Sequence, residues 1–385
     1  MTFKTNFDQI LSEQELEDLH AFSNSQGRPP SWSVVFCRDF HEKNASKADF
    51  TTYRAFNLII AEPAGKSWLL SQKHRLLPPT DYSEIASMMA EIRCYGGLLQ
   101  AGYVVEPIDT GTEPTPDFKV KYNNFLKPGE SSRTFYVEVA TKREDGAETN
   151  ITESIAKGIL PVEVQRKDIV AGDKKIQFTT REVYPLGKPD PNKPNDSAIA
   201  NAISRICAIK QKETQALEDE PTLLWIDFID LDSFRGRTFA DHFGTLLTNP
   251  HNGGLSSGFI WYAFYGWKGA PIFEFQSFTD KRVKMGHDGR FNKEGQPSKY
   301  NGALICIEGN TVFFENPQAN FPLNQDERVM LHGLPNFNIS KSVASWYEGG
   351  ANELLSHQRK TIQKIASMKI RPAAGHHGPL NLVVK

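Results

Sequence analysis

Three carboxylates that follow one another along the chain have the types and spacing for metal chemistry. Glu91 lies in a stretch with helical periodicity, Asp117 directly follows Pro116, and Glu138 lies within the apolar run "FYVEVAT". A charge is expensive to bury among apolar side chains. Glu138 therefore either lies on an edge strand with one solvated face or takes part in chemistry.

The spacing between Asp117 and Glu138 allows them to lie together. The intervening residues suffice for a strand, a loop containing Lys127-Pro128-Gly129, and a strand back. Carboxylates at close range repel one another unless a cation lies between them. Oxygen ligands with open coordination positions suit Mg²⁺ or Mn²⁺. We therefore expect a metal site formed by Asp117 and Glu138, with Glu91 as a third carboxylate.

Helices and strands are expected to alternate around this candidate site. The apolar spacing predicts a helix over residues 83–101 and a second helix over 196–216. Between and after them, strands are expected at "YVVEP", "DFKVKY", "RTFYVEVAT" and "TLLWIDFIDLD". In the last of these, Asp227 is expected to point outward or to cap the following loop, with a role as a further acidic ligand as the alternative. The alternation predicts an α/β fold with a mixed sheet flanked by helices.

The remaining segments are expected to extend this core at both ends. Residues 1–75 predict an N-terminal α+β extension with a helix at Ser12–Ser23 and strands at "WSVVFCRDF" and "FNLIIAEP". Residues 76–335 form the predicted central domain, with later strands at "SSGFIWYAFYGW", "APIFEFQSF", "GALICIEG" and "TVFFENP". Residues 336–385 predict a helical tail with a basic helix near 354–368. That helix is expected to be a solvated face or a phosphate-binding arm.

This order of elements resembles the PD-(D/E)xK superfamily, also called restriction-endonuclease-like nucleases. The similarity is carried by the helical Glu91, by Pro116-Asp117, by Glu138-Val139-Ala140 in a hydrophobic strand, and by "ISRICAIKQKETQ" followed by "PTLLWIDF". It covers residues from about 83 to 230. The resemblance implies a restriction-endonuclease-like core and metal-dependent hydrolysis of nucleic acid, with DNA as the main expected substrate and RNA as the second.

One departure from the family pattern concerns the lysine that usually follows the glutamate by two positions. Here that position is Ala140, and Lys142 is the nearest replacement on the same face of the strand. The resemblance assigns Lys142 the role of stabilising charge on the phosphate. Lys210, Gln211 or Lys212 could supply the group instead. Loss of the lysine also leaves open a catalytically inactive protein that binds nucleic acid or protein on a degenerate nuclease fold.

Composition narrows the setting. With a formal net charge of −2, the protein as a whole does not attract nucleic acid electrostatically, so any such contact relies on local basic patches. The four cysteines form no CxxC pair, which suits a reducing cytoplasm better than a disulfide framework or a zinc ribbon. The first residues do not resemble a signal peptide, and no apolar stretch is long enough to span a bilayer, so no membrane association is expected. The sequence is compatible with a homo-oligomer and with a monomer.

Overall fold

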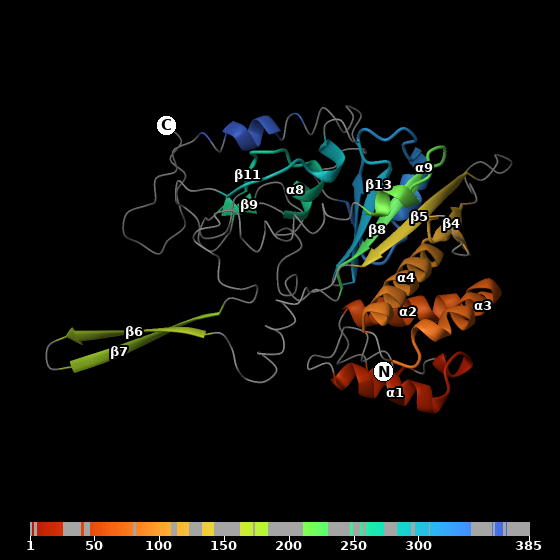
Figure 1. Ribbon diagram of the computed structural model, residues 1–385, viewed down its shortest axis with the longest axis horizontal. Coiled ribbons are helices and arrows are strands. Elements are labelled where there is room, and N and C mark those ends of the chain that lie inside the picture. Colours follow the sequence, from red (N-terminus) through yellow and green to blue (C-terminus); the bar gives the residue numbers. More distant parts are fainter. Residues whose placement is uncertain are drawn as a thin grey trace.

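A mixed sheet forms the centre of this computed structural model (Figure 1). The structure describes residues 2–3, 6–25, 40–41, 47–79, 82–108, 114–122, 133–141, 162–171, 174–183, 211–229, 247–248, 255–256, 259–272, 283–293, 297–307, 309–339, 356, 359–364 and 367. The fold is α/β, with the sheet flanked by helices as the sequence predicts.

The sheet has seven strands in the order β15-β14-β13-β8-β5-β4-β3. Strands β3, β4 and β5 form an antiparallel meander, and β8 then runs parallel to β5. Strand β13 is parallel to β8 and forms a hairpin with β14, and β15 adds in parallel at the edge. The bounds are β3 (Val104–Pro107), β4 (Phe118–Lys121), β5 (Thr134–Thr141), β8 (Thr222–Asp227), β13 (Gly302–Ile307), β14 (Asn310–Glu315) and β15 (Phe337–Ile339).

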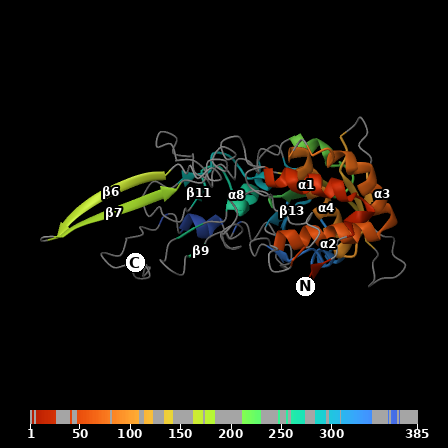
Figure 2. The same cartoon turned by 90° about the horizontal axis from the view of Figure 1, so that it is seen from below.

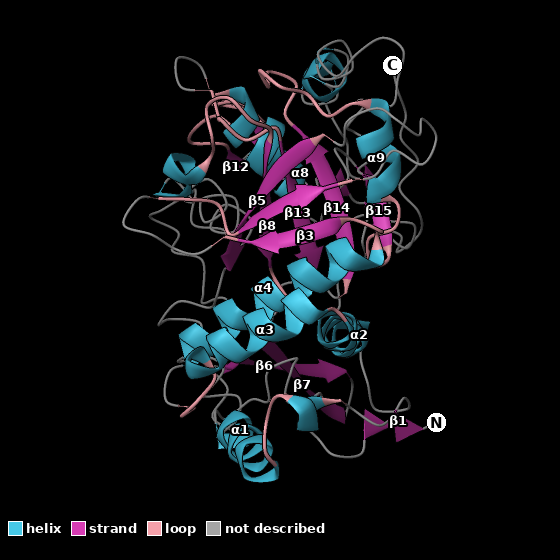
Figure 3. Ribbon diagram, turned by 90° about the vertical axis from the view of Figure 1, so that its right-hand side faces the viewer, coloured by secondary structure: helices cyan, strands magenta, loops and turns pink. Residues whose placement is uncertain are grey.

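One face of the sheet is covered by helices from the first hundred residues (Figure 3). Helix α4 packs on β5 and β3, and α2 packs on α4. The N-terminal helices contribute side chains to the same core as the sheet, on both sides of the predicted domain boundary at residue 75. Their bounds are α1 (Glu13–Ser25), α2 (Lys47–Ala61), α3 (Pro63–Gln72) and α4 (Tyr82–Gln100).

Short segments from the second half of the chain cover the other face. Helix α8 lies on the side of the sheet opposite α4 (Figure 1), and its aromatic side chains pack against inward-facing residues of β8, β13 and β14. The remaining described elements are α9 (Gln325–Leu331), β11 (Pro271–Ile272), β12 (Val283–Lys284) and the 3₁₀ helices η5 (Gln211–Gln215) and η7 (Arg290–Asn292), with α8 at Phe259–Tyr265.

Further helices and strands lie outside the main sheet. The β6–β7 hairpin extends away from it in two perpendicular views (Figures 1 and 2). These elements are η1 (Phe7–Gln9), η4 (Lys73–Arg75), β1 (Thr2–Phe3), β2 (Phe40–His41), β6 (Val162–Ala171), β7 (Lys174–Val183), β9 (Leu247–Thr248) and β10 (Leu255–Ser256). Among the described residues, no helix combines the length and apolar character needed to cross a membrane.

Two of the predicted strands are helices, and both corrections have the same cause. "FNLIIAEP" belongs largely to α2, and the aromatic part of "SSGFIWYAFYGW" is α8. A continuous apolar run has no clear period, so it does not distinguish a buried strand from a buried helix. In α2 the flanking residues restore the helical spacing, because Ala48, Thr52, Ala55 and Ile59 are buried on one side.

Most other predicted elements are confirmed. The structure has α1, α4, β3, β4, β5, β8, β13 and β14 within a few residues of their predicted bounds. At the C-terminus, residues 359–364 are helical as expected. Of the predicted helix at 196–216, residues 211–215 form the 3₁₀ helix η5, and residues 196–210 fall outside the described residues. Most of "WSVVFCRDF" and "APIFEFQSF" also falls outside them.

Candidate functional site

The meander brings Asp117 and Glu138 to neighbouring positions. Phe118 on β4 pairs with Val137 on β5, so continuing the antiparallel register by one residue sets Asp117 opposite Glu138. The backbone N–H of Val139 donates a hydrogen bond of 2.7 Å to Asp117 Oδ2. The bond fixes the Asp117 carboxylate at the point where β4 begins, beside the residue that follows Glu138.

Glu138 lies on the face of the sheet that α8 covers. Its neighbours Val137 and Val139 belong to the core under α4, whereas Ala140 belongs to the core under α8. Because side chains alternate along a strand, Glu138 shares the face of Ala140. The side chain is fully buried, so the sheet does not leave it on the solvated edge that one interpretation of the sequence allows.

Tyr300, just before β13, is electrostatically linked to both candidate ligands. Burial raises the pKa of its phenol above the usual value, and the negative charge of Glu138 raises it further, with smaller contributions from Glu213 and Asp117. The Arg290 guanidinium opposes this shift and lies over the Tyr300 ring, 5.6 Å from its centroid. The phenol and the carboxylates therefore lie in one electrostatic neighbourhood.

Arg290 is held beside this neighbourhood by Glu213 of η5. Its Nη2 atom donates to Glu213 Oε1 at 2.6 Å. The Ser298 hydroxyl donates to the same carboxylate at 2.8 Å, and the Lys299 backbone N–H does so at 3.0 Å. The Glu213 cluster, as we call Glu213, Arg290, Ser298 and Tyr300, joins η5, η7 and the start of β13.

The same 3₁₀ helix is also tied to the segment that carries Asp117. Gln215 Nε2 donates to the backbone carbonyl of Thr115 at 3.2 Å, two residues before Asp117. Thus η5 links the Glu213 cluster to the beginning of β4.

Glu91, which the sequence predicts as a third metal ligand, forms an ion pair in the structure. Arg75 binds both of its carboxylate oxygens, with Nη1 to Oε2 at 2.6 Å and Nη2 to Oε1 at 2.8 Å. Arg75 also bonds to Glu84. Burial raises the pKa of Glu91, Arg75 opposes that shift, and the charge of Asp117 adds to it. Glu91 is thus close enough for the charge of Asp117 to affect its pKa, while its carboxylate is bound by Arg75.

Asp227 points inward, contrary to the expectation that it faces outward. It is buried at the end of β8 and accepts hydrogen bonds from Arg93 of α4, with Nε to Oδ2 at 2.7 Å and Nη2 to Oδ1 at 3.0 Å. Its Oδ1 also accepts from the Ile229 backbone N–H, as a residue that caps a loop would. Arg93 neutralises the charge of this aspartate, so we assign the pair to stability.

The donor set near Asp117 suits a hard divalent cation with two protein carboxylates. Magnesium is commonly bound through one or two carboxylates, with water or substrate oxygens completing the shell. Among the described residues, no group of three or more histidine, cysteine or acidic side chains has metal-binding geometry. The metal site predicted at Asp117 and Glu138, with Glu91 as a third ligand, therefore stays a prediction.

Lys142, the expected cation, lies outside the described residues and stays a prediction. The strand before it is regular, since β5 pairs with β8 up to Thr141 opposite Asp227. The sequence interpretation did not find the Glu213 cluster. Arg290 and Ser298 lie in polar stretches without periodicity, and no local pattern relates them to Glu213.

Comparisons with protein-family models, with curated proteins and with solved structures found no match for this chain.

Proposed function

We propose that this protein hydrolyses phosphodiester bonds in nucleic acid, with DNA as the main substrate, on a restriction-endonuclease-like core. The observation that carries the proposal is that Asp117, at the start of β4, accepts a hydrogen bond from the Val139 N–H, next to the buried Glu138 on β5. A buried carboxylate beside a second carboxylate is expensive to maintain, and such arrangements occur at functional sites.

The topology around the two carboxylates supports this assignment. Helix α4 is followed by the β3-β4-β5 meander and then by β8, parallel to β5. This is the helix, hairpin and returning strand that the resemblance implies for the core of the family. Fold-level likeness alone does not establish an activity, so the proposal depends on the two carboxylates.

Each residue of the site has a distinct proposed role. Asp117 and Glu138 bind the cation, and the Val139 N–H orients Asp117. When bound, a divalent cation polarises the phosphate and lowers the pKa of a coordinated water. Arg75 and Glu91 fix one side of the site through their ion pair. Lys142 supplies positive charge to the phosphate, the role that the resemblance gives it.

The decisive experiment replaces Asp117 by Asn. The Asn side-chain oxygen can still accept the bond from Val139, so folding is retained while a metal-binding charge is lost. We expect cleavage of supercoiled plasmid with Mg²⁺ or Mn²⁺ to fall by about 100-fold or more, as when a group that stabilises transition-state charge is removed. Single-stranded DNA and RNA, each with cation and with chelator, define the substrate.

The matched control is Glu106→Gln. It removes an exposed carboxylate from β3, where Glu106 pairs with Lys121 at 2.6 Å. This variant should cleave like the wild type. Equal cleavage by Asp117→Asn and wild type, or chelator-insensitive cleavage, would contradict the proposal.

Two observations favour a second candidate, a non-catalytic binding protein on the same fold. The usual lysine position is Ala140, which is buried in the apolar core under α8. The carboxylate expected as a third ligand is bound by Arg75. In this case calorimetric titration with Mg²⁺ or Mn²⁺ detects no site that depends on Asp117 and Glu138, and no nucleic acid is cleaved.

A further inference from the structure

A strong local excess of positive charge lies on the side of the molecule that α8 and the C-terminal helix form. The whole chain carries a net charge of −2. Among the described residues of 259–293 and 356–367, however, one acid, Asp288, occurs with seven cations. Arg290 is buried and paired with Glu213, and the other six are Lys268, Lys284, Lys293, Arg359, Lys360 and Lys364. This imbalance is local, so it needs a local explanation.

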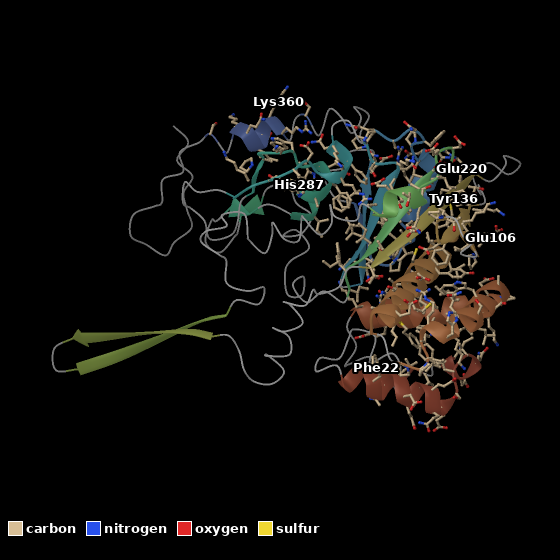
Figure 4. The ribbon with its side chains drawn as sticks, in the orientation of Figure 1. Phe22, Glu106, Tyr136, Glu220, His287 and Lys360 are labelled. Carbon is tan, nitrogen blue, oxygen red and sulfur yellow. The ribbon has the colours of Figure 1, made fainter. Side chains whose placement is uncertain are left out.

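The C-terminal helix is docked on this part of the fold. Ile362 is 2% exposed and belongs to the core under α8. The Arg359 guanidinium lies over the ring of Trp267, 5.4 Å from its centroid. These contacts place Lys360 and Lys364, both exposed, beside the turn that follows α8. Lys360 of this helix and His287 lie in the same part of the molecule (Figure 4).

Two further lysines belong to the same surface. The Met285 N–H donates to the Ala270 carbonyl at 2.9 Å, and the Gly269 N–H donates to the Met285 carbonyl at 2.8 Å. These bonds hold Lys268 and Lys284, which are also exposed, on adjacent backbone segments. We define the basic face as Lys268, Lys284, Lys360 and Lys364, around the stacked Trp267 and Arg359.

The basic face is connected to the candidate site through a single short segment. The segment 283–293 contains both Lys284 and Arg290. The Arg290 side chain binds Glu213 at 2.6 Å and lies over the Tyr300 ring. Beyond the effect of burial, the negative charge of Glu138 in turn raises the pKa of the Tyr300 phenol. A polyanion that lies on the basic face would therefore approach the part of the molecule that carries the two carboxylates.

We propose that the basic face binds the sugar-phosphate backbone of a nucleic acid and guides it toward Asp117 and Glu138. The partner class rests on the proposed function, although binding itself needs no hydrolysis. Exposed lysines neutralise phosphates without reading sequence. An anionic membrane is the less favoured partner, because the large apolar side chains exposed among the described residues lie on other elements, at Leu70, Val104, Phe321 and Val329.

The test measures binding without catalysis. Fluorescence anisotropy follows labelled 30-nucleotide single-stranded and duplex DNA in EDTA, across a series of salt concentrations. The variant combines Lys268→Glu, Lys284→Glu, Lys360→Glu and Lys364→Glu, none of which lies in the candidate site. We expect at least about a tenfold loss of affinity at low salt, and a salt slope for duplex reduced by about 1 for each phosphate that the variant no longer neutralises.

The matched control reverses two exposed cations on the opposite side of the sheet, Lys47→Glu and Arg54→Glu on α2. Its affinity should stay within about twofold of the wild type, because surface charges far from the bound DNA are largely screened. A variant with only Lys360→Glu and Lys364→Glu should show an intermediate loss. Thermal unfolding of each variant identifies any loss that is due to misfolding.

Several results would overturn the inference. They are an unchanged affinity and salt slope in the fourfold variant, an equal loss in the α2 control, and lysine-dependent binding to anionic lipid vesicles without binding to DNA. The two proposals fail separately. Salt-dependent, lysine-dependent binding by a wild-type protein that never cleaves supports the basic face and rejects hydrolysis. Cleavage that is unaffected in the fourfold variant rejects the basic face alone.

Discussion

The two faces of the central sheet hold their buried charges in different surroundings. The α4 face combines aliphatic and aromatic side chains, and its buried Asp227 is matched by one arginine, Arg93, through two hydrogen bonds. The α8 face is rich in aromatic residues, including Trp261, Tyr262, Phe264, Tyr265, Phe291, Tyr300 and Phe314.

The two buried carboxylates, Asp227 and Glu138, differ in the ionisable groups around them. Asp227 is neutralised within one pair by Arg93. On the α8 face, burial and the charges of Glu138 and Glu213 raise the pKa of Tyr300, and the charge of Arg290 lowers it. Several ionisable groups therefore share one environment. Shared, perturbed ionisable groups are typical of sites that act on a ligand.

Removing Arg93 should produce the largest loss of stability. Arg93→Met leaves Asp227 charged and buried, and breaking such a pair typically costs about 3–5 kcal/mol. Urea unfolding at neutral pH measures the change. The double variant Arg93→Met with Asp227→Leu should regain most of the loss, because neither charge remains. If the double variant is as unstable as the single one, the pair does not account for the effect.

Removing Arg290 should have a smaller effect, because its partner is less buried. The Glu213 side chain is 30% exposed, compared with 1% for Asp227, so water and the Ser298 hydroxyl can still solvate it. We expect Arg290→Met to lower the unfolding free energy by about 1.5–3 kcal/mol, the range for hydrogen bonds to charged groups. A loss as large as that of Arg93→Met would show that the two faces do not differ in this respect.

Two adjacent glycines of α4 test how closely α2 and α4 approach one another on their side of the sheet. A Cβ at Gly96 would overlap the backbone of Ala55 in α2, including its carbonyl oxygen at 2.8 Å. A Cβ at Gly97 would meet only side-chain atoms of Pro335 and Trp225 at 3.4 Å. We expect Gly96→Ala to destabilise by about 1–3 kcal/mol.

Gly97→Ala serves as the control for helix propensity. Alanine favours a helix interior by up to about 1 kcal/mol over glycine, so this variant should be neutral or slightly more stable. Thermal melts of both variants give the comparison. Equal stability of the two would show that α2 and α4 are not in backbone contact at Gly96.

The smallest expected effect is a pH dependence at the end of β14. Burial raises the pKa of Glu315 despite its bond to Arg328 at 2.7 Å. Above the ordinary glutamate pKa and up to the raised one, the folded state binds more protons than the unfolded state. Stability from this group is therefore fully present at lower pH and is lost as pH rises through the raised pKa.

The variant Glu315→Gln isolates this contribution. The difference in unfolding free energy, wild type minus Glu315→Gln, should decrease as pH rises from about 4.5 into the weakly acidic range. Urea unfolding at several pH values measures it. A difference that increases with pH would mean that the bond to Arg328 outweighs burial.

How much of the fold the sequence predicts depends on whether each segment has a period. Helix α4 has apolar residues at Ile85, Met88, Met89 and Ile92, and β4 alternates buried and half-buried residues, so both were predictable. The apolar runs now in α2 and α8 have no such signal, and the strands expected there were wrong. For these runs, packing against α4 or the sheet selected the helix.

For the candidate site too, locally encoded features were predictable and contacts between separate elements were not. The sequence by itself determined that a Pro-Asp strand and a Glu-containing strand follow a helix that carries Glu91, because each element is encoded locally. Only the tertiary structure decided that Arg75 engages Glu91, that Asp227 turns inward to Arg93, and that Arg290 lies over Tyr300. These contacts join residues of separate elements, and which elements meet is set by burial of the two sheet faces, which no local pattern contains.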